Sequence, residues 1–163
     1  MKKLFAILLS LCLLAGTAAL AEPMILENMP SYPGQPSVIS GTQLRFALPD
    51  GWEPLPGMPG CDLYTGEDGA LSLTVMAGEG DLAACEAEYE ALRKSGALGE
   101  CFYAQINGRL WLLSSTADEL QNYAQTQIDE NTLLTFAFVT AEGTLQQEFL
   151  LEVLGSLMPV GGV

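Results

Sequence analysis

The chain has 163 residues, of which 20 are acidic and 6 basic, and its net charge is −14 at pH 7. So few lysines and arginines argue against nucleic-acid binding and against docking on anionic lipid, because both rely on cationic side chains. The chain has no histidine, which excludes Ser-His-Asp and Cys-His nucleophiles and His-ligated zinc or iron sites.

Residues 1–21 have the order of a secretory signal peptide. Lys2 and Lys3 precede an apolar run over 4–16, and small residues then lead to Ala21. Because the run is shorter than a membrane span and ends at a cleavage signal, we expect cleavage after Ala21. The prediction is a secreted or extracytoplasmic bacterial protein. Removing these residues leaves four basic and 20 acidic side chains, a net charge of −16.

The cysteines give little evidence of chemistry. Cys12 lies inside the signal after a bulky leucine, so we do not expect lipid attachment there. Cys61, Cys85 and Cys101 remain, without the CxxC spacing of a redox motif or a zinc knuckle. We interpret them as three small core residues, and one disulfide between any two of them stays open.

The first part of the exported chain is predicted to be a tether followed by strands. Residues 22–40 contain four prolines and no hydrophobic period, which predicts an extended, mobile spacer. Alternating apolar residues over 44–48 predict a strand, and three prolines make 53–60 a rigid loop. Strands over 61–65 and 71–76 flank a Gly-rich turn and form a hairpin.

A helix is predicted over 82–95. Apolar residues recur there at helical spacing, and Asp81 is a good N-cap because its side chain can accept hydrogen bonds from the free amides of the first turn. Glu90 and Lys94 stand in the favourable order for an ion pair one turn apart. Gly96 is the expected C-cap.

Two further hairpins follow. The strands 100–106 and 109–116 flank Asn-Gly, the dipeptide that best tolerates the positive φ angles of a tight turn. The strands 121–128 and 132–140 flank a polar turn at 129–131. The second arm of each hairpin is apolar on both faces, which predicts that both faces are covered.

The last element is predicted to be a helix. Thr144 and Gln147 fit a capping box, and an apolar stripe runs from Leu145 to Leu157 before Pro159 ends the helix. The tail, residues 160–163, has no anchor motif.

The element order predicts the fold class. Hairpins require antiparallel pairing, and two helices are too few to cover both faces of a parallel sheet. We therefore predict one α+β domain over 41–159. It would be a three-layer sandwich in which about seven antiparallel strands have a helix on each face.

Three stretches carry a family resemblance: Phe46-Ala47-Leu48-Pro49-Asp50-Gly51-Trp52, Ile106-Asn107-Gly108 and the helix end Leu154-Gly155-Ser156-Leu157. In these the chain resembles the PsbP-like superfamily, which includes DcrB-like envelope proteins and Mog-type Ran-binding proteins. The resemblance covers residues 42–158. It implies a seven-stranded antiparallel sheet between helices and a role in binding or assembly. No family metal or partner residue carries over to this chain.

Acidic turns are the candidate metal sites, at Asp62, 67–68, 118–119, Asp129 and Glu130. Calcium needs several oxygen ligands from a shaped loop, and each of these turns supplies only one or two carboxylates. We expect solvated turns without a cofactor. If two turns meet, Asp129 and Glu130 are the metal candidates.

Three aromatic residues are candidates for a ligand-binding surface, because Trp and Tyr often supply interface energy. Trp111 lies in a strand that is apolar on both faces, so we expect it in the core. Trp52 follows the first strand and either plugs the end of the sheet or is exposed beside the proline loop. Trp52 and Tyr64 are therefore the ligand-binding candidates.

Together these features predict a secreted or envelope-associated domain that binds or assembles and is not an enzyme. Its partner would be a protein or another extracellular ligand, and the chain would be a monomer or a weak homo-oligomer without a membrane span. Two alternatives stay open. A hydrolase would need two carboxylates flanking a cleft, and no such pair is marked in the sequence. A calcium-dependent module would be more stable with calcium bound.

Overall fold

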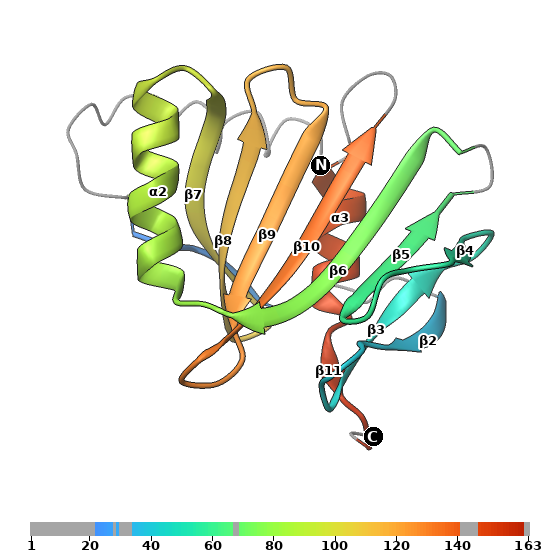
Figure 1. The fold of residues 1–163 in the computed structure, drawn as a ribbon. Helices are drawn as coiled ribbons and strands as arrows, with labels where there is room; N and C mark the ends of the chain where they lie inside the picture. Colours follow the sequence, from blue (N-terminus) through green and yellow to red (C-terminus); the bar gives the residue numbers. More distant parts are fainter. Residues whose placement is uncertain (1–21, 28, 30–33, 67–68, 141–146, 162–163) are drawn as a thin grey trace.

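A computed structural model describes residues 22–27, 29, 34–66, 69–140 and 147–161. The predicted signal peptide and the predicted capping residue Thr144 lie outside these residues. The helices are α2 (Leu82–Lys94) and α3 (Gln147–Gly155). The strands are β1 (Met24–Leu26), β2 (Gly34–Val38), β3 (Leu44–Pro49), β4 (Glu53–Leu55), β5 (Cys61–Thr65), β6 (Leu71–Glu79), β7 (Leu98–Ile106), β8 (Arg109–Thr116), β9 (Gln121–Gln127), β10 (Thr132–Thr140) and β11 (Met158–Pro159) (Figure 1).

The strands form two sheets. The main sheet has eight strands in the order β1-β7-β8-β9-β10-β6-β5-β4, and the second has three in the order β11-β3-β2. All neighbours are antiparallel except β1, which pairs parallel to β7 with Met24 opposite Ala104. The main sheet is therefore mixed.

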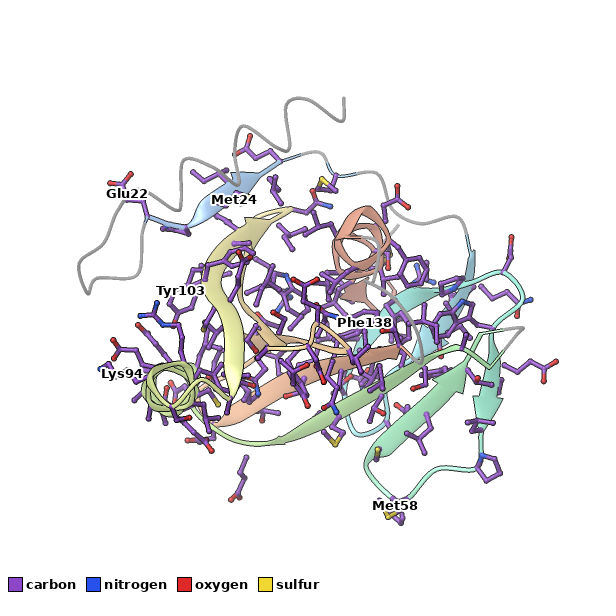
Figure 2. All side chains as sticks on the ribbon, turned by 90° about the horizontal axis from the view of Figure 1, so that it is seen from above. Glu22, Met24, Met58, Lys94, Tyr103 and Phe138 are labelled. Atoms are coloured by element: carbon purple, nitrogen blue, oxygen red, sulfur yellow. The ribbon has the colours of Figure 1, made fainter. Side chains whose placement is uncertain are left out.

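An aromatic cluster lies between the main sheet, the second sheet and α3. Phe46 of β3 contacts Phe136 of β10 edge to face, with ring centroids 5.3 Å apart, and Trp111 of β8 contacts the same ring at 5.7 Å. All three side chains are at most 1% exposed. The figures show α3 beside the curved main sheet (Figure 2), where Leu150, Leu151, Val153 and Leu154 join this core.

The helix α2 packs on a smaller apolar cluster. Its Leu82 contacts Leu112 of β8 and Leu133 of β10, which alternate along their strands with the core residues Leu113 and Leu134. The helix contacts β7, β8 and β9. Beyond it, the same face of β6 and β10 remains partly open, and Met76 and Val139 are 40% and 38% exposed.

The predicted three-layer α+β sandwich is wrong. The described chain is mostly β, its main sheet is mixed with eight strands, and a second sheet shares the core with α3. The apolar pattern of 132–140 suggested two fully covered faces, but Val139 shows that the cover is incomplete. The reason is that the second sheet, which contains β3, shares one side of the core with α3, where the prediction placed a helix alone.

Several local predictions are confirmed. The helix over 82–94 has Asp81 as N-cap, which accepts from the Ala83 amide at 2.8 Å, and Lys94 lies 3.5 Å from Glu90. The C-cap is Ser95 rather than the predicted Gly96, which follows it with φ +79°, the conformation expected just after a helix end.

All three predicted hairpins also form. In β7–β8, Ile106 is opposite Arg109, and the two turn residues have φ angles of 47° and 80°. The hairpins β5–β6 and β9–β10 pair with the expected antiparallel register. Beyond its predicted end at residue 76, β6 continues to Glu79, opposite Thr132.

The prediction of a mobile tether over 22–40 is wrong where the structure describes it. The segment contributes β1 to the main sheet and β2 to the second sheet. Gly34 permits the second pairing, because a Cβ atom there would lie 2.1 Å from the carbonyl oxygen of Leu48. The hydroxyls of Ser37 and Tyr64 lie 2.8 Å apart and join β2 to β5.

Two other boundaries differ from the predictions. Within the expected proline loop, Glu53–Leu55 forms the edge strand β4, where a proline costs no ladder hydrogen bond. The last helix ends at Gly155 rather than near Pro159. Met158 and Pro159 then pair with Arg45 and Leu44 as β11, because pairing with β3 replaces the last helical turn.

Candidate functional site

An apolar cleft lies where β1 and α3 meet β7, β8 and β9. Its enclosed volume is about 80 Å³. Because a space of this size holds several water molecules, it suits one small apolar group rather than a whole ligand. The cleft is lined by Met24, Leu26, Glu100, Phe102, Ala104, Leu113, Ser114, Ser115, Asn122, Tyr123, Leu150 and Leu151.

Strand alternation explains which side chains reach the cleft. Met24 and Leu26 of β1 line it, whereas Ile25 between them is 62% exposed. Along β7, the residues at 100, 102 and 104 line it in the same way. Period-two alternation therefore gives the cleft a wall from two neighbouring strands. Leu150 and Leu151 of α3 form the opposite wall.

One end of the cleft lies at an irregularity in β7. The β7–β8 register shifts between Leu98 and Cys101, and the Glu100 amide donates to the Ser115 hydroxyl at 3.4 Å. Gly99 fits this place because a Cβ atom there would lie 3.2 Å from both Ser115 Oγ and the Thr116 carbonyl oxygen. The bulge brings Glu100 to the cleft beside Ser115 and Asn122.

Glu100 is the one charged residue among those that line the cleft, and its side chain is exposed. Across β7, Tyr103 donates to the Glu86 carboxylate of α2 at 2.7 Å. Burial and that carboxylate raise the pKa of Tyr103. Tyr103 and Glu86 lie on the α2 face of the sheet, so the negative charge at the cleft comes from Glu100.

The cleft does not have the constellation of a hydrolase. Such an enzyme needs two carboxylates on either side of the scissile bond, and the lining contains Glu100 alone. The geometry supports binding of an apolar group next to a negative charge.

Two larger surface pockets are less suitable. One, of about 470 Å³, contains Arg109 beside the C-terminal end of α3, where a cation is favourable in the helix dipole. Burial lowers the pKa of Arg109. Its neighbours Asn107 and Gln127 already hydrogen-bond within the fold. Asn107 and Gln127 therefore serve the structure rather than a ligand.

The second, of about 330 Å³, lies under the proline loop, with Tyr64 and Asp62 in its wall. Tyr64 is 5% exposed and packs edge to face on Phe46. Trp52 does not line this pocket and instead stacks on Phe149 of α3, with ring centroids 5.7 Å apart. The two aromatic candidates therefore share no pocket, and both pack against the hydrophobic core. Trp111 lies in the core, as predicted, at 0% exposure.

Three of the candidate carboxylates accept hydrogen bonds from backbone amides, and the acidic pair at 67–68 lies outside the described residues. Asp62 accepts from the Ser40 amide at 2.8 Å, Asp118 from the Leu120 amide at 3.1 Å, and Asp129 from the Asn131 amide at 3.0 Å. The bond from the Asn131 amide lowers the pKa of Asp129. In the described part of the chain, no three Cys, Asp or Glu side chains form a group that could hold a metal ion. Asp129 and Glu130 thus acquire no third ligand there.

The three cysteines are half-buried free thiols. Cys85 and Tyr89 of α2 pack with Cys101 and Tyr103 of β7 around the smaller apolar cluster. Cys61 lies on β5 opposite Met76. Burial raises the pKa of Cys101 to about 11. This thiol is therefore protonated at neutral pH and unsuited to nucleophilic chemistry.

Sequence reasoning missed the cleft. Met24, Ile25 and Leu26 are all apolar, so their alternating exposure cannot be read from this run of three residues between prolines. Phe102 and Leu113 were expected to be strand residues, and nothing local indicates that α3 leaves a space over this cross-strand pair.

Comparisons with known proteins identify no family. No family model and no curated protein matches the chain. A crystal structure of a protein from Bacteroides thetaiotaomicron VPI-5482 is similar with a TM-score of 0.49 and 16% identity. The match covers 77% of this chain and 48% of the Bacteroides chain. The matched part spans about half the length of the Bacteroides chain. The resemblance to the PsbP-like superfamily stays a prediction.

Among the residues that the structure describes, no helix has the length and apolar character needed to cross a bilayer.

Proposed function

We propose that this chain is a secreted bacterial binding module without catalytic activity, and that its cleft receives an apolar group of the ligand. The observation that supports this proposal is the partly open apolar cleft between β1, β7 and α3. A packed core leaves few voids larger than a water molecule, so an open apolar space at the surface is a candidate binding site.

The size of the cleft limits what it contributes. Burying one aliphatic side chain is favourable by about 1.5–3 kcal/mol, which alone gives only weak affinity. Further contacts must come from the surface around the cleft. The ligand we expect is therefore larger than the cleft and inserts one apolar group into it.

The test uses N-acetyl-leucine amide as a probe and NMR shifts of the purified protein as the readout. We expect shifts at residues lining the cleft, loss of these shifts in Leu26→Asn, and their retention in Ile25→Asn. The second variant is a matched control because Ile25 is exposed beside Leu26. A thermal melt of each variant checks that it folds. Equal shifts in both folded variants would refute the cleft as the site.

A second assay separates binding from hydrolysis. The protein is incubated with a panel of glycans, and Glu100→Gln is the comparison because Glu100 is the carboxylate at the cleft. We expect no turnover. Turnover that Glu100→Gln abolishes would contradict a purely binding role.

A further inference from the structure

A row of oxygen-bearing side chains crosses three neighbouring strands at one end of the cleft. Glu100 of β7, Ser115 of β8 and Asn122 of β9 form this row, and all three line the cleft. Ser115 and Asn122 lie opposite each other in the β8–β9 pair, and the Glu100 amide donates to the Ser115 hydroxyl at 3.4 Å. The cleft therefore has one polar end beside its apolar walls.

The oxygen acceptors of this row are available to a ligand. Asn122 donates through Nδ2 to the Glu119 carbonyl at 3.3 Å, so Oδ1 is its remaining acceptor. Among the described residues, no group donates a hydrogen bond to Asn122 Oδ1 or to the Glu100 carboxylate. The Ser115 hydroxyl oxygen has a second lone pair besides the one that the Glu100 amide uses. Acceptors with one negative charge suit a cation that has several N–H donors.

The next row of the same sheet face is apolar. Phe102 and Leu113 lie opposite each other there, two residues along their strands from Glu100 and Ser115. Two residues of a strand span about 7 Å. Since a carbon–carbon bond is about 1.5 Å long, an unbranched chain of about five carbons covers this distance. One ligand group can therefore place a cation at the polar row and its aliphatic part over Phe102 and Leu113.

Side chains, rather than the main-chain edge of β7, must recognise this group. By the register of β1, Glu22 and Pro23 lie beside Phe102 and Tyr103, so this chain itself takes up that edge. Neither Glu22 nor Pro23 lines the cleft. The cleft is thus bounded by β1 and its preceding residues on one side and by α3 on the other.

We propose that the apolar group bound in the cleft is an aliphatic primary amine, whose ammonium binds at Glu100, Ser115 and Asn122. An ammonium group has three N–H donors and no acceptor, which matches the three acceptor side chains. After the predicted cleavage, four basic residues stand against 20 acidic ones, and this charge attracts cations to the protein. The proposal rests on the proposed function, because it uses the same cleft and names the class of its ligand.

The test is an NMR titration of the purified protein with pentylammonium chloride and with pentan-1-ol, a neutral probe of the same length. We expect both to shift residues that line the cleft, and pentylammonium to bind about fivefold more tightly, as for an exposed ion pair. Ethylammonium lacks three methylene groups, each of which is worth about fourfold in affinity. We therefore expect it to bind more than tenfold more weakly than pentylammonium.

A matched pair of variants tests where the charge preference arises. In Glu100→Gln the preference for pentylammonium over pentan-1-ol should vanish, while the affinity for pentan-1-ol stays the same. Glu88→Gln removes an exposed carboxylate of α2 and should keep the preference. Thermal melts check that both variants fold. An equal preference in the two folded variants would overturn the role of Glu100, because the net charge of the chain would then explain the preference.

The two proposals can fail separately. If pentan-1-ol or N-acetyl-leucine amide shifts the cleft residues but pentylammonium binds no more tightly than pentan-1-ol, the ammonium proposal fails and the cleft remains a binding site. If none of these probes shifts the cleft residues, the proposed function itself fails.

Discussion

Replacing Asn107 tests whether its side-chain hydrogen bonds hold the N-terminal segment against the β7–β8 turn. The side chain accepts from the Met29 amide at 3.0 Å, and it donates to the Gly155 carbonyl at 3.0 Å and to the Met29 carbonyl at 3.3 Å. One residue thus joins three segments: the stretch after β1, the β7–β8 turn and the end of α3. Its φ of 47° is also unfavourable for most side chains.

The expected cost follows from these contacts. Each hydrogen bond at the surface is worth about 0.5–1 kcal/mol, so three give about 2 kcal/mol. Alanine in the left-handed conformation adds about 1 kcal/mol, which glycine avoids. We therefore expect Asn107→Ala to lower the free energy of unfolding by about 3 kcal/mol and Asn107→Gly by about 2 kcal/mol.

Urea unfolding of the purified protein measures both values, and Asn122→Ala is the control. The Asn122 side chain makes one local bond, to the Glu119 carbonyl at 3.3 Å, so its loss costs at most about 1 kcal/mol. If Asn107→Ala were no more destabilising than this control, the side chain would not join these segments. A glycine variant less stable than the alanine variant would refute the backbone part of the argument.

Four further predictions test the rest of the account. Gly34→Ala places a Cβ atom 2.1 Å from the Leu48 carbonyl oxygen, and we expect faster amide exchange throughout β2 and β3; unchanged exchange would show that β2 does not pair. Trp52→Ala removes the stack on Phe149 and should cost about 2 kcal/mol in urea unfolding because the ring is half-buried, whereas a fully stable variant would contradict the contact. The pKa of Cys101 is raised to about 11, so iodoacetamide at pH 8 should modify this thiol about 100-fold more slowly in the native than in the unfolded protein. Because the folded pKa of Cys101 lies above the unfolded value, the contribution of the protonated thiol to the free energy of unfolding is full below pH about 9 and is lost as the pH rises towards 11. Melts of the protein and of Cys101→Ala at alkaline pH can check this. Calcium at millimolar concentration should leave the melting temperature unchanged, because Asp129 and Glu130 gain no third ligand among the described residues; a rise absent with magnesium would reverse this conclusion.

Local signals predicted the local structure well. The ends of α2 depend on residues within a few positions, so Asp81 was recognised as the N-cap, and Gly96 marked the C-terminal end one residue after the C-cap Ser95. The Asn-Gly dipeptide likewise predicted the β7–β8 hairpin. These features need no knowledge of distant segments.

Long-range contacts were not predictable in the same way. Nothing near Asn107 indicates that its side chain reaches Met29, which is 78 residues earlier. The prolines over 22–40 indicated an unpaired spacer, yet Pro36 sits in β2 at the edge of its sheet, where a missing amide costs no ladder bond. The extra strands changed the fold class and also built one wall of the cleft.

The candidate site was missed for the same reason. Its walls come from β1, the β7–β9 strands and α3, which are far apart in sequence. Sequence reasoning instead selected Trp52 and Tyr64 by residue type, and the structure uses both in packing. A cleft left between well-packed elements has no local sequence signal.

The most direct test of the central claim is an NMR titration of the full protein with N-acetyl-leucine amide. We expect amide shifts to concentrate on residues 100–104 of β7 and on Leu150 and Leu151 of α3, which line the cleft, and to be lost in Leu26→Asn but kept in Ile25→Asn. Shifts confined to other surfaces, or equal shifts in both folded variants, would contradict the cleft as a binding site.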